Sequence, residues 1–131
     1  MILLIHWNNF FKIWIDSFTK NYLKFDGRCS RLEFNLSTLF LCIMAVNVYY
    51  LSKIKSTDNS LMVIYLISGF FFMYLFINDF AVTTRRLHDL NLNGFLQFII
   101  YFIPCGQLLM LWLIFKKGTS GDNKYGEEPK Y

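Results

Sequence analysis

The fold is decided by residues 61–77, which read LMVIYLISGFFFMYLFI and contain no charged side chain. Residues 34–52 and residues 96–115 are likewise uncharged. Twenty helical residues extend about 30 Å, which is the thickness of the hydrocarbon core of a bilayer. Each stretch is therefore a candidate transmembrane helix, in which the backbone satisfies its own hydrogen bonds.

The composition of the 131 residues favours lipid over water as the solvent. Hydrophobic residues make up 55% and charged residues 17% of the chain, against ~25% charged in ordinary soluble domains. A soluble all-α protein would have too little polar surface to cover three such helices. We predict an all-α integral membrane protein with a single domain over residues 1–131. Its expected parts are an interfacial helix at 1–25, membrane segments at 34–52, 61–80 and 96–115, and a polar tail at 116–131.

The N-terminal helix is predicted from aromatic residues that recur at steps of three or four. They are Trp7, Phe11, Trp14, Phe18 and Tyr22. This spacing places them on one face of an amphipathic helix. That face either lies at the membrane interface or packs on the protein's own helices.

The third membrane segment contains Pro104 and Gly106 at its midpoint, and proline breaks the hydrogen bonding of a helix. We favour a kinked third crossing, because 20 residues suit one span. The alternative is a re-entrant hairpin that returns the tail to the side from which the segment entered. With a cytoplasmic N-terminus, three crossings place seven Lys and Arg inside and six outside, whereas the hairpin places eleven inside and two outside. Cytoplasmic loops are enriched in Lys and Arg, so the charge count favours the hairpin.

The second membrane segment should continue as a helix beyond the bilayer, because residues 61–89 contain one glycine and no proline. Residues 91–94 (NLNG) are the first stop signal, with Gly94 available as a left-handed cap. The ionisable residues near this end are Asp79, Arg85, Arg86, His88 and Asp89. Their spacing allows salt bridges within the helix, from either arginine to Asp89 and from Arg86 to Asp79.

Three segments resemble the motifs of one family. They are FDGRCSRLEF at 25–34, RRLHD at 85–89 continuing to NGF at 93–95, and GTSGDNKYGEEP at 118–129. In this order they are similar to F-x-G-R-x-S-R-x-E-[FY], R-R-L-H-D-x-x-x-S-G-W and G-T-x-G-x-N-R-[FY]-G-x-x-P of DUF805, and IPCG at 103–106 is similar to its I-P-x-x-G. The resemblance covers roughly residues 10–131. It implies a small bacterial inner-membrane protein, and it supplies no catalytic activity.

Arg28 and Arg31 precede the first membrane segment and have two interpretations. As lone charges they would set topology and anchor lipid headgroups. Alternatively, they close on Asp89 or on the tail across the helix bundle.

The candidate interface layer consists of these two arginines with Arg85, Arg86, His88 and Asp89. We favour an ion-pair latch between helix ends. The alternatives are a site for lipid phosphate or carboxylate, which two arginines can grip, and general-base chemistry by the His–Asp pair. Neighbours on a helix point about 100° apart, which disfavours the last.

The candidate residues of the tail are Gly121, Asn123, Tyr125, Gly126 and Pro129. They predict a cluster of turns, because no lysine and hydroxyl follow as in a phosphate-binding loop. The three Cys and two His have no metal-ligand spacing, so we expect no metal or cofactor.

The predicted function is that of a non-enzymatic inner-membrane protein with a cytoplasmic N-terminus. It would act through lipid or protein contacts at the interface layer, with the bilayer, anionic lipid, a second copy or another membrane protein as partner. The dispersed positive charge does not indicate nucleic acid. The alternatives are a small oligomeric channel or transporter subunit, and an enzyme that acts on lipid headgroups.

Overall fold

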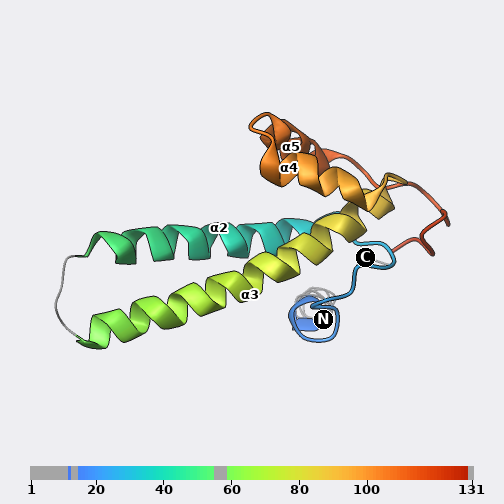
Figure 1. The fold of residues 1–131 in the computed structure, drawn as a ribbon. Helices are drawn as coiled ribbons and strands as arrows, with labels where there is room; N and C mark the ends of the chain where they lie inside the picture. The colour runs from blue at the N-terminus through green and yellow to red at the C-terminus, as the bar shows by residue number, and fades with distance from the viewer. Residues whose placement is uncertain (1–11, 13–14, 55–58, 130–131) are drawn as a thin grey trace, which may run out of the picture.

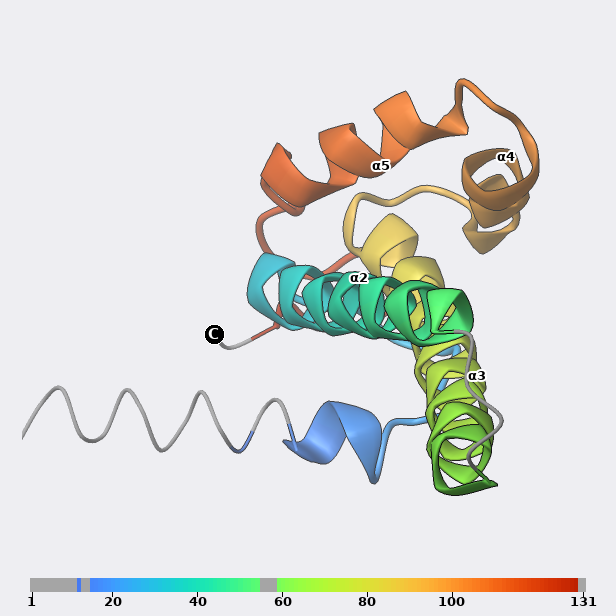
Figure 2. The same ribbon diagram turned by 90° about the vertical axis from the view of Figure 1, so that its left-hand side faces the viewer.

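The computed structural model describes residue 12, residues 15–54 and residues 59–129. The helices in that part of the chain are α2 (Arg31–Lys53), α3 (Asn59–Asp89), the 3-10 turn η1 (Gly94–Leu96), α4 (Gln97–Phe102) and α5 (Gly106–Phe115). Figure 1 shows α2 and α3 as an antiparallel pair with α4 and α5 on one side. In Figure 2 the N-terminal segment lies on the opposite side of the pair. The predicted all-α class is confirmed for the described residues.

Helix α2 begins after Ser30, which is its N-cap residue. The side-chain oxygen of Ser30 accepts the backbone N–H of Glu33 at 3.2 Å, which satisfies one of the N–H groups that a helix start leaves without a partner. The Glu33 carboxylate turns instead to Arg85 on α3. The start of α2 is thereby fixed to the end of α3.

Helix α3 is continuous over 31 residues, or about 46 Å at 1.5 Å per residue. The prediction that it extends past the apolar segment to Asp89 is confirmed. The left-handed residue after it is Asn91, with a φ of 60°, and not the predicted Gly94. Gly94 is needed for space, because a Cβ there would overlap the Thr84 side chain.

The apolar stretches of α2 and α3 face outward. Only 11% of the residues in the most apolar stretch of α2, and 6% in that of α3, are buried within the protein. The core helices of a soluble protein would be mostly buried. Both helices are long and apolar enough to cross a membrane, and their bare apolar surface suits lipid.

The third apolar segment differs from the favoured prediction of a continuous crossing. It consists of η1, α4 and α5, with a break at Ile103–Cys105. Helix α4 has 6 residues and α5 has 10, or about 9 Å and 15 Å, too short for a 30 Å core. The expected break at Pro104 is confirmed, and the third spanning helix is not.

The α4–α5 hairpin turns back beside α3. Gln97 at the start of α4 accepts from Thr84, and Tyr101 one turn later donates to Asp79, so α4 runs antiparallel to α3. The carbonyl of Leu113 near the end of α5 then accepts from Arg86. The chain has therefore returned to the end of α3 where α4 began, which is the geometry of the re-entrant alternative.

Most of the predicted N-terminal helix lies outside the described residues. Within them, Ile15–Phe18 are helical and residues 19–23 form turns and a bend, so the helix does not reach Tyr22. The Tyr22 ring stacks on Tyr74 of α3, with 4.4 Å between ring centroids. Tyr22 thus packs on the protein's own helices.

Gly106→Ala should destabilise the protein, because a Cβ at this position would overlap the carbonyl oxygen of Ile99 and the Cα of Ile100 in α4. Overpacking of this kind costs about 1–3 kcal/mol. Gly69→Ala is the matched control, since a Cβ there meets nothing within 4 Å and alanine is the better helix former. Thermal unfolding in detergent tests this. A melting temperature for Gly106→Ala at or above that of Gly69→Ala would contradict the tight hairpin.

Candidate functional site

The Asp89 carboxylate lies between two guanidinium groups. Its Oδ1 accepts Nε of Arg28 at 3.0 Å and lies 2.9 Å from Nη2 of the same residue. Its Oδ2 accepts Nη1 of Arg86 at 2.5 Å. The exposed fractions of the three side chains are 1% for Arg28, 0% for Arg86 and 4% for Asp89. We call these three residues the Arg–Asp latch.

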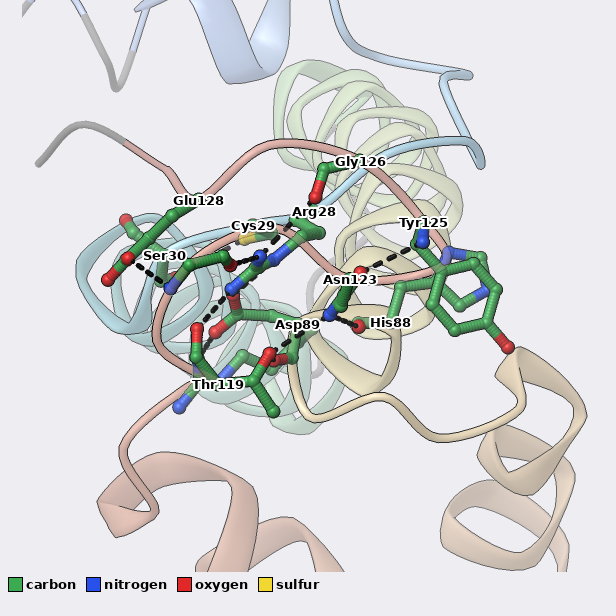
Figure 3. Close-up of polar contacts among 12 residues, drawn as sticks. Arg28, Cys29, Ser30, His88, Asp89, Thr119, Asn123, Tyr125, Gly126 and Glu128 are labelled. Atoms are coloured by element: carbon green, nitrogen blue, oxygen red, sulfur yellow. Dashed lines mark hydrogen bonds and ion pairs between the residues drawn. The ribbon is translucent and has the colours of Figure 1, made fainter.

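Arg28 also binds the polar tail. It donates to the carbonyls of Thr119, Gly121 and Gly126, so the tail curves around its guanidinium group (Figure 3). The backbone N–H and the hydroxyl of Thr119 in turn both donate to the Asp89 carbonyl, each at 2.9 Å. The first and third sequence motifs therefore meet at the end of the second.

Arg86 caps helix α5. Its Nε and Nη2 each donate to the Leu113 carbonyl at 3.2 Å, and Nη2 also donates to the Lys116 carbonyl. The last carbonyls of a helix have no partner within it, and a basic side chain near them is favourable. Arg86 thus holds the returning arm of the hairpin.

Arg85 pairs with Glu33 and not with Asp89 as its spacing allowed. Nη1 of Arg85 lies 2.8 Å from Oε1 of Glu33, and both side chains are buried. Nε and Nη2 of Arg85 have no partner within the described part of the chain. Arg85 and Arg86 therefore fasten α3 to different helices.

His88 holds the tail by ring stacking. Its ring lies flat on Tyr125, with 3.7 Å between centroids, and its Nδ1 is 3.2 Å from the Gly27 carbonyl oxygen. Asn123 donates to the His88 carbonyl at 3.0 Å, and its own side-chain oxygen accepts the Tyr125 N–H. Figure 3 shows this layer beside the latch.

Glycine is required in the tail for two different reasons, backbone conformation and lack of space for a side chain. Gly121 and Gly126 have φ angles of 71° and 127°, which L side chains rarely adopt. A Cβ on Gly118 would overlap the Asp89 carboxylate. Gly118 therefore lets the chain approach the latch closely, a role that spacing alone did not indicate.

Arg31 and Pro129 lie at the edge of the candidate site. Arg31 is exposed, and its one hydrogen bond within the described residues goes to the Phe115 carbonyl at 3.3 Å. Pro129 lines the same small cavity as Arg31. The sequence predicted Arg31 as part of the interface layer and Pro129 as part of the tail motif.

A second polar layer was missed by sequence reasoning. Asp79 is fully buried and accepts from the hydroxyls of Tyr101 at 2.8 Å and Thr38 at 3.1 Å. Its predicted pairing with Arg86 is wrong, because Arg86 points to Asp89 and α5. The sequence did carry a signal for this layer: Thr38, Asp79 and Tyr101 are polar residues within the three apolar segments.

His88 and Asp89 do not act on each other in this geometry. Both carboxylate oxygens of Asp89 are held by arginines, and the described side-chain contacts of His88 are with Tyr125 and Gly27. The Asp89 carboxylate is therefore not the partner that would orient the His88 ring in an acid–base pair. Among the described residues, no group of three His, Cys, Asp or Glu could hold a metal ion.

Cys29 should be unreactive in the folded protein. Burial raises the pKa of its thiol well above the ordinary value, and the nearby Glu33 carboxylate raises it further, so the reactive thiolate is scarce. In a Cys42→Ser/Cys105→Ser variant, maleimide labelling at pH 8 should be roughly ten times slower, or more, than at exposed Ser120→Cys in a chain without other cysteines. Unfolding should abolish the difference. Equal rates before unfolding would contradict the buried position of Cys29.

Comparisons with known proteins agree with this arrangement of motifs. The family model for "Protein of unknown function (DUF805)" matches residues 22–127. Inner membrane protein YhaI of Escherichia coli K12 is 31% identical over 119 residues, covering 90% of this chain and 96% of the relative. Inner membrane protein YhaH of the same organism is 32% identical over 124 residues, covering 89% and 96%. No solved structure matches significantly. The three motifs that build the latch and the match over residues 22–127 lead to one conclusion: the chain belongs to the DUF805 family.

Proposed function

We propose that this chain is a non-enzymatic integral protein of the inner membrane, in which α2 and α3 cross the bilayer. Both relatives are named inner membrane proteins. Both helices have the length and apolarity for a crossing and expose their apolar residues. The end that carries the latch then lies at the membrane surface, where its polar groups reach water and headgroups.

The hydrogen bonding of Arg28 supports a structural role for the latch. A guanidinium group has five N–H donors, and Arg28 makes five contacts, to Asp89 twice and to three tail carbonyls. No donor is left for an external anion. The latch therefore bonds to the protein itself: it holds the segment before α2, helices α3 and α5, and the tail together.

The locked end carries exposed basic residues beside the exposed acidic residues Asp26, Asp122, Glu127 and Glu128. Arg31, Lys116, Lys117 and Lys124 are exposed there. Basic residues at a membrane surface attract anionic lipid, each by about 1 kcal/mol. The role proposed for the protein is thus lipid contact by a rigid membrane-embedded unit, without chemistry on the lipid.

The hairpin geometry supports a cytoplasmic N-terminus with the tail on the same side. The tail is bonded to Arg28 and Asp89, so the start of α2, the end of α3 and the tail share one surface. For this topology the count along the sequence is eleven Lys and Arg on the cytoplasmic side and two on the other side. This bias is the one that the positive-inside rule favours.

Arg86→Ala and Asp89→Ala should each destabilise the protein by about 3–5 kcal/mol, because removal of one partner leaves buried charge or carbonyl groups unpaired. Lys53→Ala is the control. Its side chain lies over the Tyr49 ring on an exposed surface, and such changes stay within about 0.5 kcal/mol. Thermal unfolding in detergent measures the difference. Equal melting temperatures for the three variants would contradict the stabilising role of the latch.

Topology is tested with single cysteines in a chain whose Cys29, Cys42 and Cys105 are replaced. We expect an impermeant maleimide to label Ser56→Cys in intact cells and to leave Ser120→Cys unlabelled until the cells are opened. Labelling of both sites in intact cells would instead support a third crossing.

A further inference from the structure

A small cavity of about 130 Å³ lies against the outer side of the latch. It is lined by the start of α2, the chain after α5, the end of the tail and the Arg86–Asp89 pair. Cavities of ~150 Å³ hold a benzene-sized guest, so this one has room for a phosphate group.

The cavity is lined by two cations that the latch does not use. Among the described residues, Arg31 has only the long 3.3 Å bond to the Phe115 carbonyl. Lys117 is exposed and has no partner within the described residues. The neighbouring Lys116 differs, because its ammonium group lies over the Trp112 ring. Arg31 and Lys117 therefore reach the cavity from α2 and from the chain after α5, with most of their donors available.

A buried hydroxyl adds a neutral donor. Ser30 lines the cavity and is 6% exposed. Its oxygen accepts the Glu33 N–H, but a serine hydroxyl also carries a hydrogen to donate. Ser30 is the N-cap of the 23-residue helix α2, so the positive end of the helix dipole lies at the same wall.

One acidic residue opposes these groups. Glu128 lines the cavity from the tail, and its Oε2 accepts the Gly121 N–H at 2.6 Å. Since Asp89 is neutralised by the latch, Glu128 is the anion that a bound phosphate would face. Its charge should weaken the binding of a phosphate without preventing it.

We propose that this cavity binds a phosphate group, with Arg31, Lys117 and Ser30 as its contacts, and that an anionic phospholipid headgroup supplies it. Lysine and arginine together with a helix start match the charge and the acceptor oxygens of phosphate. The inference rests on the proposed function, because it needs this end of the protein at the membrane surface. The proposed phosphate contacts are made by Arg31, Lys117 and Ser30. The latch residues Arg28, Arg86 and Asp89 do not bind the phosphate.

The test uses the full chain in a nonionic detergent, titrated with phosphatidylglycerol and, separately, with phosphatidylcholine. Native mass spectrometry counts the lipids retained. Phosphatidylglycerol should bind in preference, and Arg31→Gln and Lys117→Gln should each weaken it about five-fold. Glu128→Gln should strengthen it. Lys53→Gln, which removes a cation at the other end of the α2–α3 pair, should change it less than about two-fold.

A third titration with inorganic phosphate separates the two sources of the ligand. If phosphatidylglycerol alone raises the melting temperature, and this rise is lost in Arg31→Gln, the ligand is a lipid headgroup. If inorganic phosphate does the same, the cavity binds the free anion as well. Equal retention of phosphatidylglycerol and phosphatidylcholine would overturn the proposed site. Unchanged affinity for phosphatidylglycerol in both Arg31→Gln and Lys117→Gln would also overturn it.

The failure of this inference can be told from failure of the proposed function. Arg31 and Lys117 lie outside the latch, so their variants without added lipid should melt as the wild type does. Lost headgroup preference together with destabilised Arg86→Ala and Asp89→Ala variants would overturn the cavity site alone. Unaffected melting of the latch variants would instead overturn the latch.

Discussion

The carboxylate of Asp89, buried between Arg28 and Arg86, is the constraint on which the rest of the polar end depends. Removing an ion from water costs several kcal/mol unless partners replace the water. Two guanidinium groups around one carboxylate still leave one positive charge to be solvated. Backbone carbonyls provide that solvation, and they come from the end of α5 and from the tail. The latch therefore orders segments that would otherwise have few reasons to lie together.

The two ends of the α2–α3 pair are built for different surroundings. At the latch end the buried residues are largely polar, and hydrogen bonds between helices fix their positions. Towards residues 54–59 the helices separate (Figure 1) and carry exposed apolar side chains. Helices in lipid gain no hydrophobic energy from packing together. Polar contacts such as Asp79 with Tyr101 and Thr38 thus supply the association that apolar residues cannot.

Local features could be predicted from the sequence because their causes are local. The uncharged stretch at 34–52 predicted α2, the lack of proline predicted the length of α3, and Pro104 predicted the break. The direction of α5 could not be predicted, since a proline in 20 apolar residues fits a kinked crossing and a reversal equally. What decides it is long-range: the fit of Gly106 against α4 and the capping of α5 by Arg86. The partner of Arg85 was missed for the same reason, because Glu33 is 52 residues away.

The central claim is that one carboxylate holds distant segments together, and hydrogen–deuterium exchange of Asp89→Asn tests it most directly. Asparagine keeps the shape and removes the charge that both arginines share. The account predicts faster amide exchange in three separate places: the start of α2, the end of α5, and residues 118–126 of the tail. The apolar half of α3 should exchange as before. Faster exchange confined to the last turn of α3 would contradict the claim, because the other segments would then be held by contacts of their own.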